Sequence, residues 1–203
     1  IKAEKINMKK NVLIVVAHPD DETIWMGGYI YQNKDRWNTT IISLCRRDDP
    51  DRSPKFKRVC EEYKAKGFMS DLEDDRLDEV SPDEVMARIQ KFSSGSYDYV
   101  FTHGENGEYG HKRHLDVNKA VTEMLKSNQL SAERLFLFSY QKKGNICYAD
   151  RSSDEFINLN KSQLKLKKKI IQEWYGFSKD SFEELCCGDA EGFKVVEIKS
   201  HKN

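Results

Sequence analysis

The sequence predicts an α/β fold: a Rossmann-like three-layer sandwich with a mostly parallel central sheet. Short apolar runs rich in Val and Ile, typical of buried strands, alternate along the chain with longer segments of helical periodicity. This alternation implies right-handed crossover connections, which make neighbouring strands parallel. The 203 residues are enough to bury one hydrophobic core of this type.

The predicted elements follow one another in strand–helix order from residue 11. The first strand is a β-branched run, and the helix after it carries Ile24, Gly27, Gly28 and Tyr31 on one side. The predicted strands are residues 11–17, 39–45, 97–102, 134–140 and 193–198, and the predicted helices are residues 22–33, 53–66, 82–94, 110–127 and 161–176.

Caps and apolar stripes define the later helices. Ser53 precedes Pro54, which places a cap residue before a proline at the first helical position, and Gly67 is predicted to end that helix. Residues 81–84 read Ser-Pro-Asp-Glu, a capping box that begins the next helix. The helix predicted at 161–176 has a stripe of apolar residues at helical spacing: Leu166, Ile170, Trp174 and Phe177.

Composition excludes several classes of protein. The 34 basic and 34 acidic residues cancel, so the charge gives no reason to expect nucleic acid as the main partner. The longest clean apolar run, residues 12–17, is far shorter than the roughly 18 residues that a transmembrane helix needs. We therefore expect no transmembrane segment, and a homo-oligomer is one option for the assembly.

The cysteines favour a reducing compartment. Their number is odd and no C-x-x-C pair occurs, which argues against a disulfide framework and against a thiolate zinc site; they are Cys45, Cys60, Cys147, Cys186 and Cys187. With no secretory segment in the sequence, we expect the cytoplasm. The adjacent Cys186 and Cys187 are expected to be half-buried loop thiols, with a vicinal redox pair as the alternative.

Residues 1–10 are predicted to be an N-terminal extension, part of which could be foreign to the natural chain if Met8 is its start. Residues 11–203 are predicted to form one domain. Two charge runs, the acidic residues 71–84 and the lysine-rich residues 161–169, are predicted to be solvated faces. The lysine run could alternatively favour an anionic substrate or a lipid surface.

Two segments carry residues suited to catalysis. The first, residues 17–22, places His18, Asp20, Asp21 and Glu22 where the first strand ends and a helix begins. Ligands bind at this edge of open parallel sheets. A polar loop with a helix cap would explain the acids, but not the histidine followed by a rigid proline.

The second segment, residues 102–114, contains three glycines and leads from a later strand into a helix. His111 and His114 are three residues apart, so at the start of a helix they project on the same side. Such a pair alone is a weak signal, because surface histidines are common. Four of the five histidines of the chain nevertheless lie in these two segments, and the fifth is His201 in the tail.

Together the two segments offer the parts of a catalytic zinc site. Such a site needs three His or carboxylate ligands and an open position for water. Neither segment contains cysteine, so two histidines and one carboxylate would fit zinc, with iron or another divalent metal as alternatives. A remaining acid could take a proton from water, and a remaining histidine could stabilise charge on the substrate. The residues thus predict a metal-dependent hydrolase but leave the role of each acid open.

The chain resembles the PIG-L/LmbE-like family of zinc-dependent N-deacetylases. Residues 18–22, His-Pro-Asp-Asp-Glu, match the first motif of the family, and residues 110–114 match its H-x-x-H motif. Family members often have Pro-Asp where Lys112 and Arg113 stand. The order of elements from about residue 11 is also similar, so the resemblance covers most of the chain.

The resemblance implies a role for each motif residue. His18, Asp21 and His114 would bind zinc, and Asp20 would be the general base for the attacking water. His111 would stabilise the oxyanion and help to protonate the departing amine; a neighbouring carboxylate is expected to keep it protonated. The implied reaction is removal of the acetyl group from an N-acetylated sugar or glycoconjugate, usually an N-acetylglucosamine unit, to give acetate and a free amine.

Four further residues are candidates for substrate contact. Arg46 follows the second strand at the same sheet edge, His103 ends a strand beside the site, and Glu108 with Tyr109 is expected at the mouth. Solvated loop charges are the preferred explanation for Arg46, and a capped strand-end histidine would explain His103 equally well.

Three rival functions are a metal-dependent amidase acting on a thiol–sugar conjugate or another small amide, a non-catalytic binding protein, and a nucleotide-binding protein. The last lacks a G-x-G-x-x-G turn after the first strand.

Overall fold

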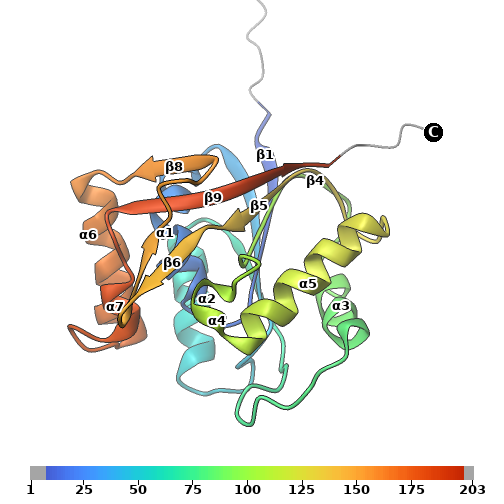
Figure 1. Ribbon diagram of the computed structural model, residues 1–203, viewed down its shortest axis with the longest axis horizontal. Coiled ribbons are helices and arrows are strands. Elements are labelled where there is room, and N and C mark those ends of the chain that lie inside the picture. Colours follow the sequence, from blue (N-terminus) through green and yellow to red (C-terminus); the bar gives the residue numbers. More distant parts are fainter. Residues whose placement is uncertain (1–7, 199–203) are drawn as a thin grey trace, which may run out of the picture.

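A seven-stranded mixed sheet forms the middle layer of the molecule (Figure 1). The structure is a computed structural model that describes residues 8–198, so residues 1–7 of the expected extension and His201 lie outside the described residues. The sheet order is β3-β2-β1-β4-β5-β9-β8. The strands are β1 (Lys10–Val16), β2 (Trp37–Ser43), β3 (Lys66–Met69), β4 (Ser96–Thr102), β5 (Ser131–Phe138), β8 (Glu155–Asn158) and β9 (Ala190–Glu197).

The first five strands in this order are parallel, whereas β9 runs antiparallel to both β5 and β8. A separate antiparallel hairpin consists of β6 (Tyr140–Lys143) and β7 (Ile146–Ala149). The predicted fold class, a three-layer sandwich with a mostly parallel sheet, is therefore confirmed.

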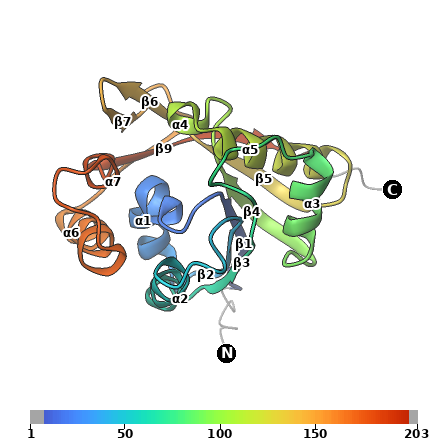
Figure 2. The same cartoon turned by 90° about the horizontal axis from the view of Figure 1, so that it is seen from below.

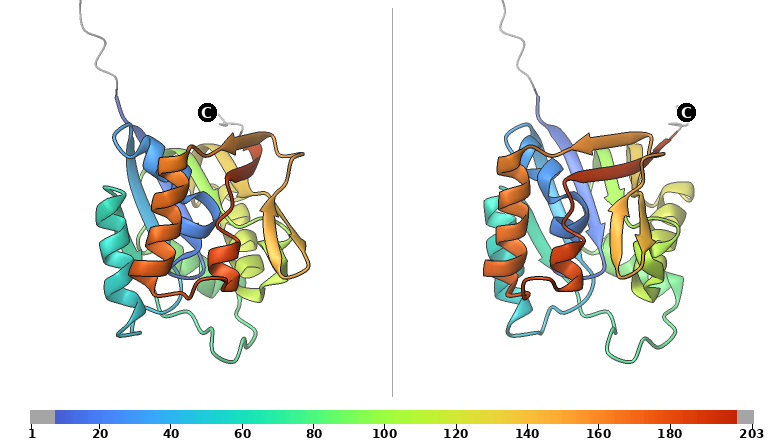
Figure 3. Two further views of the ribbon diagram at one scale, coloured as in Figure 1. Left: turned by 90° about the vertical axis from the view of Figure 1, so that its left-hand side faces the viewer. Right: turned by 60° about the vertical axis from the view of Figure 1, so that its left-hand side comes forward.

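Helices cover both faces of the sheet, with α1, α2 and α6 on one face and α3 and α5 on the other (Figures 2 and 3). The pleat of β1 produces this division, because Val12, Ile14 and Val16 enter one core and Leu13 and Val15 enter the other. The helices are α1 (Asp21–Asn33), α2 (Arg52–Glu62), α3 (Pro82–Gln90), α4 (Gly107–Gly110), α5 (Lys112–Lys126), α6 (Lys161–Lys169), which continues into the π-helix η1 (Ile170–Tyr175), and α7 (Phe182–Leu185).

The short elements depart from the sequence prediction. Helix α2 ends at Glu62, and Gly67, predicted to end it, lies in β3 instead. A Cβ atom on Gly67 would lie 2.5 Å from Sγ of Cys60, so the glycine allows β3 to pack closely against α2. The strand predicted at 134–140 is interrupted at Ser139, where β5 ends before the hairpin. Strands β3, β6, β7 and β8 have four residues each, too few for a periodicity to be read from sequence.

Helix α1 is broken at Met26, whose φ of −149° is not helical. The carboxylate of Glu191 in β9 accepts hydrogen bonds from the backbone N–H groups of Gly28 and Tyr29, at 2.9 and 2.8 Å. Lys167 also donates to Glu191 at 2.8 Å, and neither side chain of this ion pair is exposed. Lys167 is thus buried, in contrast to the solvated lysine face that the sequence predicts. Through Glu191 it connects α6 to the part of α1 that follows the break at Met26.

All five cysteines are buried and free. Sγ of Cys186 accepts a hydrogen bond from the backbone N–H of Cys147, while Sγ of Cys187 donates to the carbonyl of Glu183. The two adjacent thiols are therefore oriented toward different neighbours. Within residues 8–198, no helix is long and apolar enough to cross a membrane.

Candidate active site

The two predicted catalytic segments meet at the carboxyl ends of β1 and β4, where the strand order changes direction. His18 and Asp20 follow β1, and His111 and His114 lie at the start of α5 after the loop that follows β4. A cavity of about 380 Å³ opens at this edge. Its walls include His18, Asp20, Asp21, Arg46, Asp74, Tyr109, His111, Phe177 and Phe182.

The turn after β1 holds Asp20 in a strained backbone conformation with φ 127°. Such a conformation costs on the order of 1–3 kcal/mol and persists only where the surroundings enforce it. The buried carboxylate of Glu22 accepts the N–H of Asp20 at 3.0 Å and the hydroxyl groups of Thr23 and Tyr175 at 2.8 and 2.9 Å. Glu22 thereby fixes the turn that directs Asp20 and Asp21 into the site.

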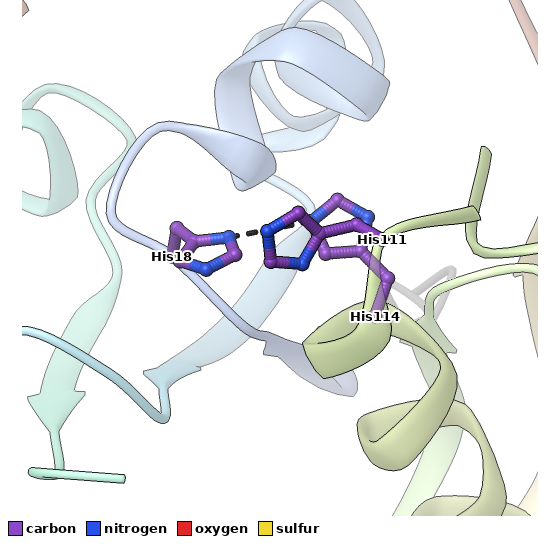
Figure 4. A group of neighbouring side chains, drawn as sticks. All are labelled: His18, His111 and His114. Carbon is purple, nitrogen blue, oxygen red and sulfur yellow. Dashed lines mark hydrogen bonds between the residues drawn. The ribbon is translucent and has the colours of Figure 1, made fainter. Parts of the chain in front are cut away.

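Donor atoms close enough to hold a metal ion gather here in two overlapping groups: His18, His111 and His114, and Asp21, His103 and His114. Nδ1 of His18 lies 3.2 Å from one oxygen of Asp21 and 3.3 Å from Nε2 of His114, and that Nε2 lies 3.4 Å from the other oxygen of Asp21. With bonds of about 2.0–2.1 Å to zinc, the ligands of a tetrahedral site are about 3.4 Å apart. Figure 4 shows the rings of His18 and His114 facing each other with His111 beside them. The donor set and its spacing therefore fit zinc.

The electrostatics also favour a cation at this position. Burial alone would lower the pKa of His18, but hydrogen bonds to Asp21 and Asp74 raise it to about 10. Burial opposes ionisation of Asp21, yet the charges of His114 and His103 and the hydrogen bond from His18 hold the pKa of Asp21 well below its usual range. The pocket thus stabilises positive charge between these carboxylates.

Asp20 differs from its neighbour Asp21. Burial and the adjacent charge of Asp21 raise the pKa of Asp20 well above its usual range, and Arg52 approaches it at only 3.4 Å. Two adjacent carboxylates therefore have opposite shifts in pKa. Such a divergence is typical of a pair in which one acid stays ionised and the other takes and releases protons.

His103 packs against His114 but offers no free ring nitrogen. Its Nε2 accepts the backbone N–H of Ala17 at 2.9 Å, and its Nδ1 donates to Glu108 at 2.8 Å. The rings of His103 and His114 are stacked, with centroids 3.8 Å apart. His103 therefore supports the ring of His114 from behind, away from the cavity.

Glu108 is fully buried behind His114. One of its oxygens accepts from Nδ1 of both His103 and His114, and the other accepts the N–H of Gly104 at 2.7 Å. Burial would raise the pKa of Glu108, but electrostatic interactions and hydrogen bonds with His103 and His114 lower it to about 2. The carboxylate consequently fixes the proton of His114 on Nδ1 and leaves its Nε2 as a free donor atom for a metal.

Asp74 makes the equivalent contact to His18. One of its oxygens lies 3.0 Å from Nε2 of His18, and the other accepts two hydrogen bonds from Arg46, at 3.1 and 2.7 Å. Burial would raise the pKa of Asp74, but His18 and Arg46 lower it to about 2. This residue belongs to the acidic run 71–84, so the prediction that the run is a solvated face is wrong at Asp74. Nothing in its local sequence distinguishes it from its acidic neighbours.

Trp25 completes the support of the proposed ligands. Its indole N–H donates to Asp21 at 2.9 Å, and its carbonyl, freed by the break in α1, accepts the hydroxyl of Tyr140 at 2.5 Å. Sequence reasoning missed this contact, because the spacing of Trp25 is equally typical of a core residue.

His111 lacks the carboxylate partner that the sequence analysis expected. Among residues 8–198 its hydrogen-bonding neighbour is the backbone N–H of Arg113, which donates to Nδ1 at 3.3 Å. Burial and the charges of His18 and His114 lower the pKa of His111 to about 4. The neutral ring then carries its proton on Nε2, so it can donate one hydrogen bond without being protonated.

The candidate substrate residues divide into two pairs. Arg46 and Tyr109 line the cavity, although Arg46 is already paired with Asp74 and Asp75. His103 and Glu108 are fully buried behind His114 rather than at the mouth. The sequence analysis did not identify three further cavity residues: Arg52, Phe177 and Phe182.

Comparison with known proteins identifies the family of this chain. The model of the PIG-L family, described as GlcNAc-PI de-N-acetylase, matches residues 13–125, which include both motifs. The chain belongs to the PIG-L family. This membership supports a deacetylase of the family. A comparison with curated proteins gave no match.

Solved structures of other proteins have the same fold. An N,N'-diacetylchitobiose deacetylase from Pyrococcus horikoshii, solved with its inhibitor MPG, superposes with a TM-score of 0.71 at 16% identity, over 95% of this chain and 88% of that one. The conserved protein TT1542 from Thermus thermophilus gives 0.67 at 16% identity, over 95% and 97%.

GalB, the 4-carboxy-2-hydroxymuconate hydratase from Pseudomonas putida KT2440, gives a TM-score of 0.65 at 16% identity, over 96% of this chain and 99% of that one. Proteins with different activities thus share the fold, so the fold alone does not determine the activity of this chain.

Proposed function

We propose that the protein is a zinc-dependent hydrolase that removes the acetyl group from an N-acetylated sugar of the N-acetylglucosamine type. The observation that carries this proposal is the spacing of His18, Asp21 and His114, 3.2–3.4 Å between donor atoms, beside the cavity that Asp20 lines. Three N and O ligands with an open fourth position are typical of catalytic zinc.

Each remaining group has a task in amide hydrolysis. A bound zinc ion would lower the pKa of water to about 7 and polarise the acetamide carbonyl. Asp20 takes the proton of the attacking water, because it lines the cavity and burial with the charge of Asp21 raises its pKa above the usual range. Asp20 can then pass this proton toward the departing amine nitrogen.

His111 is suited to stabilise the carbonyl oxygen of the substrate. Its Nε2 has no hydrogen-bond partner among the described residues, and its ring lines the cavity next to His18. A donor aimed at the carbonyl oxygen stabilises the negative charge that develops there. Because Nδ1 is occupied by the N–H of Arg113, the neutral ring is sufficient for this role.

The cavity suits a sugar. Its volume of about 380 Å³ lies within the range of small-ligand pockets, and Tyr109, Phe177 and Phe182 give it apolar walls beside the polar groups of Arg52 and Asp49. A metal-dependent amidase acting on a thiol–sugar conjugate or another small amide would use the same centre. A non-catalytic binding protein is less consistent with the chain, because all five proposed catalytic and metal-binding groups are present.

The proposed enzyme occupies one domain from residue 11. In support, β1 and β9, which lie near the two ends of the described chain, belong to the same sheet. We propose a cytoplasmic location on the evidence of the five free cysteines, which suit a reducing compartment.

The test combines metal analysis with a substrate panel. The purified protein would be analysed for bound metal and then assayed for acetate release from free N-acetylglucosamine, chito-oligosaccharides, and lipid- and thiol-linked N-acetylglucosamine. We expect one zinc ion per chain and acetate from at least one sugar. Zinc binding with cleavage of a non-sugar amide alone would favour the amidase alternative, and neither metal nor acetate would contradict the proposal.

A further inference from the structure

The two residues between the histidines of the H-x-x-H motif, Lys112 and Arg113, bond to a distant loop. Arg113 stands where family members often have Asp, and its side chain is completely buried. It donates to the carboxylate of Glu73 at 2.6 Å, to the carbonyl of Asp78 at 2.8 Å and to Asp116 at 2.8 Å, and it also contacts the carbonyl of Glu73.

These contacts hold residues 73–78 in a compact loop. The carboxylate of Glu73 also accepts the backbone N–H groups of Arg76 and Asp78, at 2.6 and 2.9 Å, so residues 73–78 form a turn around that side chain. Lys112 donates to the carbonyl of Leu77 at 2.7 Å. The first turn of α5, which carries His114, is thereby bonded to the loop at residues 73, 77 and 78.

The loop places Asp74 beside the proposed metal site. Asp74 follows Glu73 directly, and its carboxylate lies 3.0 Å from Nε2 of His18. A carboxylate at the outer nitrogen of a ligating histidine fixes the ring and makes it a better donor. Arg46 holds the same carboxylate from the solvent side, with 37% of its side chain exposed, whereas Arg113 holds the backbone from within.

We propose that Arg113 is a positioning residue: it fixes the loop 73–78 on the first turn of α5 so that Asp74 orients His18 for metal binding. The inference rests on the proposed function, because it takes His18 as a metal ligand. The two histidine ligands are then supported by two separate carboxylates, Asp74 for His18 and Glu108 for His114.

The test measures metal affinity, which requires no substrate. Zinc dissociation constants would be determined by chelator competition for the wild type, Asp74→Asn, Arg113→Met and the double variant. We expect each single change to weaken zinc binding about 10- to 100-fold. The double variant is expected to bind about as weakly as Asp74→Asn alone, because both changes act through one contact. Equal binding by Arg113→Met and the wild type, or independent effects that multiply, would overturn the inference.

Two further variants separate positioning from general stability. Arg88→Met removes another arginine of this region, which bonds to Asp71 and Glu84 but not to residues 73–78, and it should leave zinc affinity unchanged. Glu73→Gln weakens the same contact between Arg113 and the loop. It should reduce zinc affinity even if Arg113→Met fails to fold. The absorption spectrum of bound Co²⁺ should change in Asp74→Asn, Arg113→Met and Glu73→Gln but not in Arg88→Met; the reverse pattern would contradict the inference.

The result also distinguishes the two proposals. A wild-type protein that binds zinc and releases acetate, with unaltered affinity in Arg113→Met and Glu73→Gln, would refute the role of Arg113 and leave the proposed function intact. A wild-type protein that binds no zinc would refute both.

Discussion

The carboxylate of Glu108 accepts a hydrogen bond from Nδ1 of His114 at 2.5 Å, and neither side chain is exposed to solvent. The contact determines which nitrogen of the imidazole carries the proton. Nε2 of His114 is consequently left unprotonated and faces Asp21 and His18. A residue outside both sequence motifs thus prepares a motif histidine to act as a ligand.

Glu108→Gln should weaken zinc binding about 10- to 100-fold. An amide offers one acceptor oxygen, and its NH₂ group would meet either the N–H of Gly104 or the two histidine N–H groups. Chelator competition would measure the change. Glu105→Gln, an exposed residue of the same loop, is the matched control and should bind zinc as the wild type does. Unchanged affinity in Glu108→Gln would show that this support is not required.

Asp20→Asn should retain zinc and lose turnover by about 10²- to 10⁴-fold, the usual contribution of a positioned general base. The amide has the same shape, so the turn held by Glu22 should persist. Metal content and kcat would be measured on the same preparation. Asp51→Asn, on a side chain that is 62% exposed, serves as the control. Loss of zinc from Asp20→Asn would mean that Asp20 is a ligand instead.

His114→Ala should affect zinc binding, whereas His111→Ala should affect turnover. His114 lies 3.3–3.4 Å from the other two proposed ligands, so its removal should abolish tight zinc binding. His111 donates no hydrogen bond within the described site, and its removal should mainly lower kcat, by about 10²- to 10³-fold. Zinc titration together with kinetics separates the two outcomes. Equal loss of zinc in both variants would refute the distinction.

Lys167→Met should destabilise the fold by about 3–5 kcal/mol, because it leaves the charge of Glu191 buried without its partner. Urea unfolding would measure the change. The exposed Lys165 on the same helix provides the comparison, and Lys165→Met should change the free energy of unfolding by less than about 0.5 kcal/mol. Similar values for the two variants would mean that the Lys167–Glu191 pair contributes little.

The sequence was sufficient to predict the layered fold and the meeting of the two motifs, because both depend on local patterns. Apolar runs predicted β1 and β4. The carboxyl ends of parallel strands lie at one edge of the sheet, so the two motifs had to meet there. The short strands were missed, since four residues carry too little pattern and depend on contacts with distant segments.

The supporting groups could not be predicted for a different physical reason. Asp74 contacts His18 across 56 residues, and Trp25 contacts Asp21 within a helix whose pattern reads as core. Lys167 is buried only because Glu191 reaches it from β9. In each case the sequence supplies the residue type, and only the tertiary fold supplies its partner.

Removal and return of the metal test whether the protein requires zinc for catalysis. Acetate release from the best N-acetylated sugar of the panel would be measured before chelation, after chelation and after one equivalent of Zn²⁺ is added back. We expect chelation to abolish acetate release and one zinc ion per chain to restore it. Acetate release that persists in the metal-free protein would contradict this requirement.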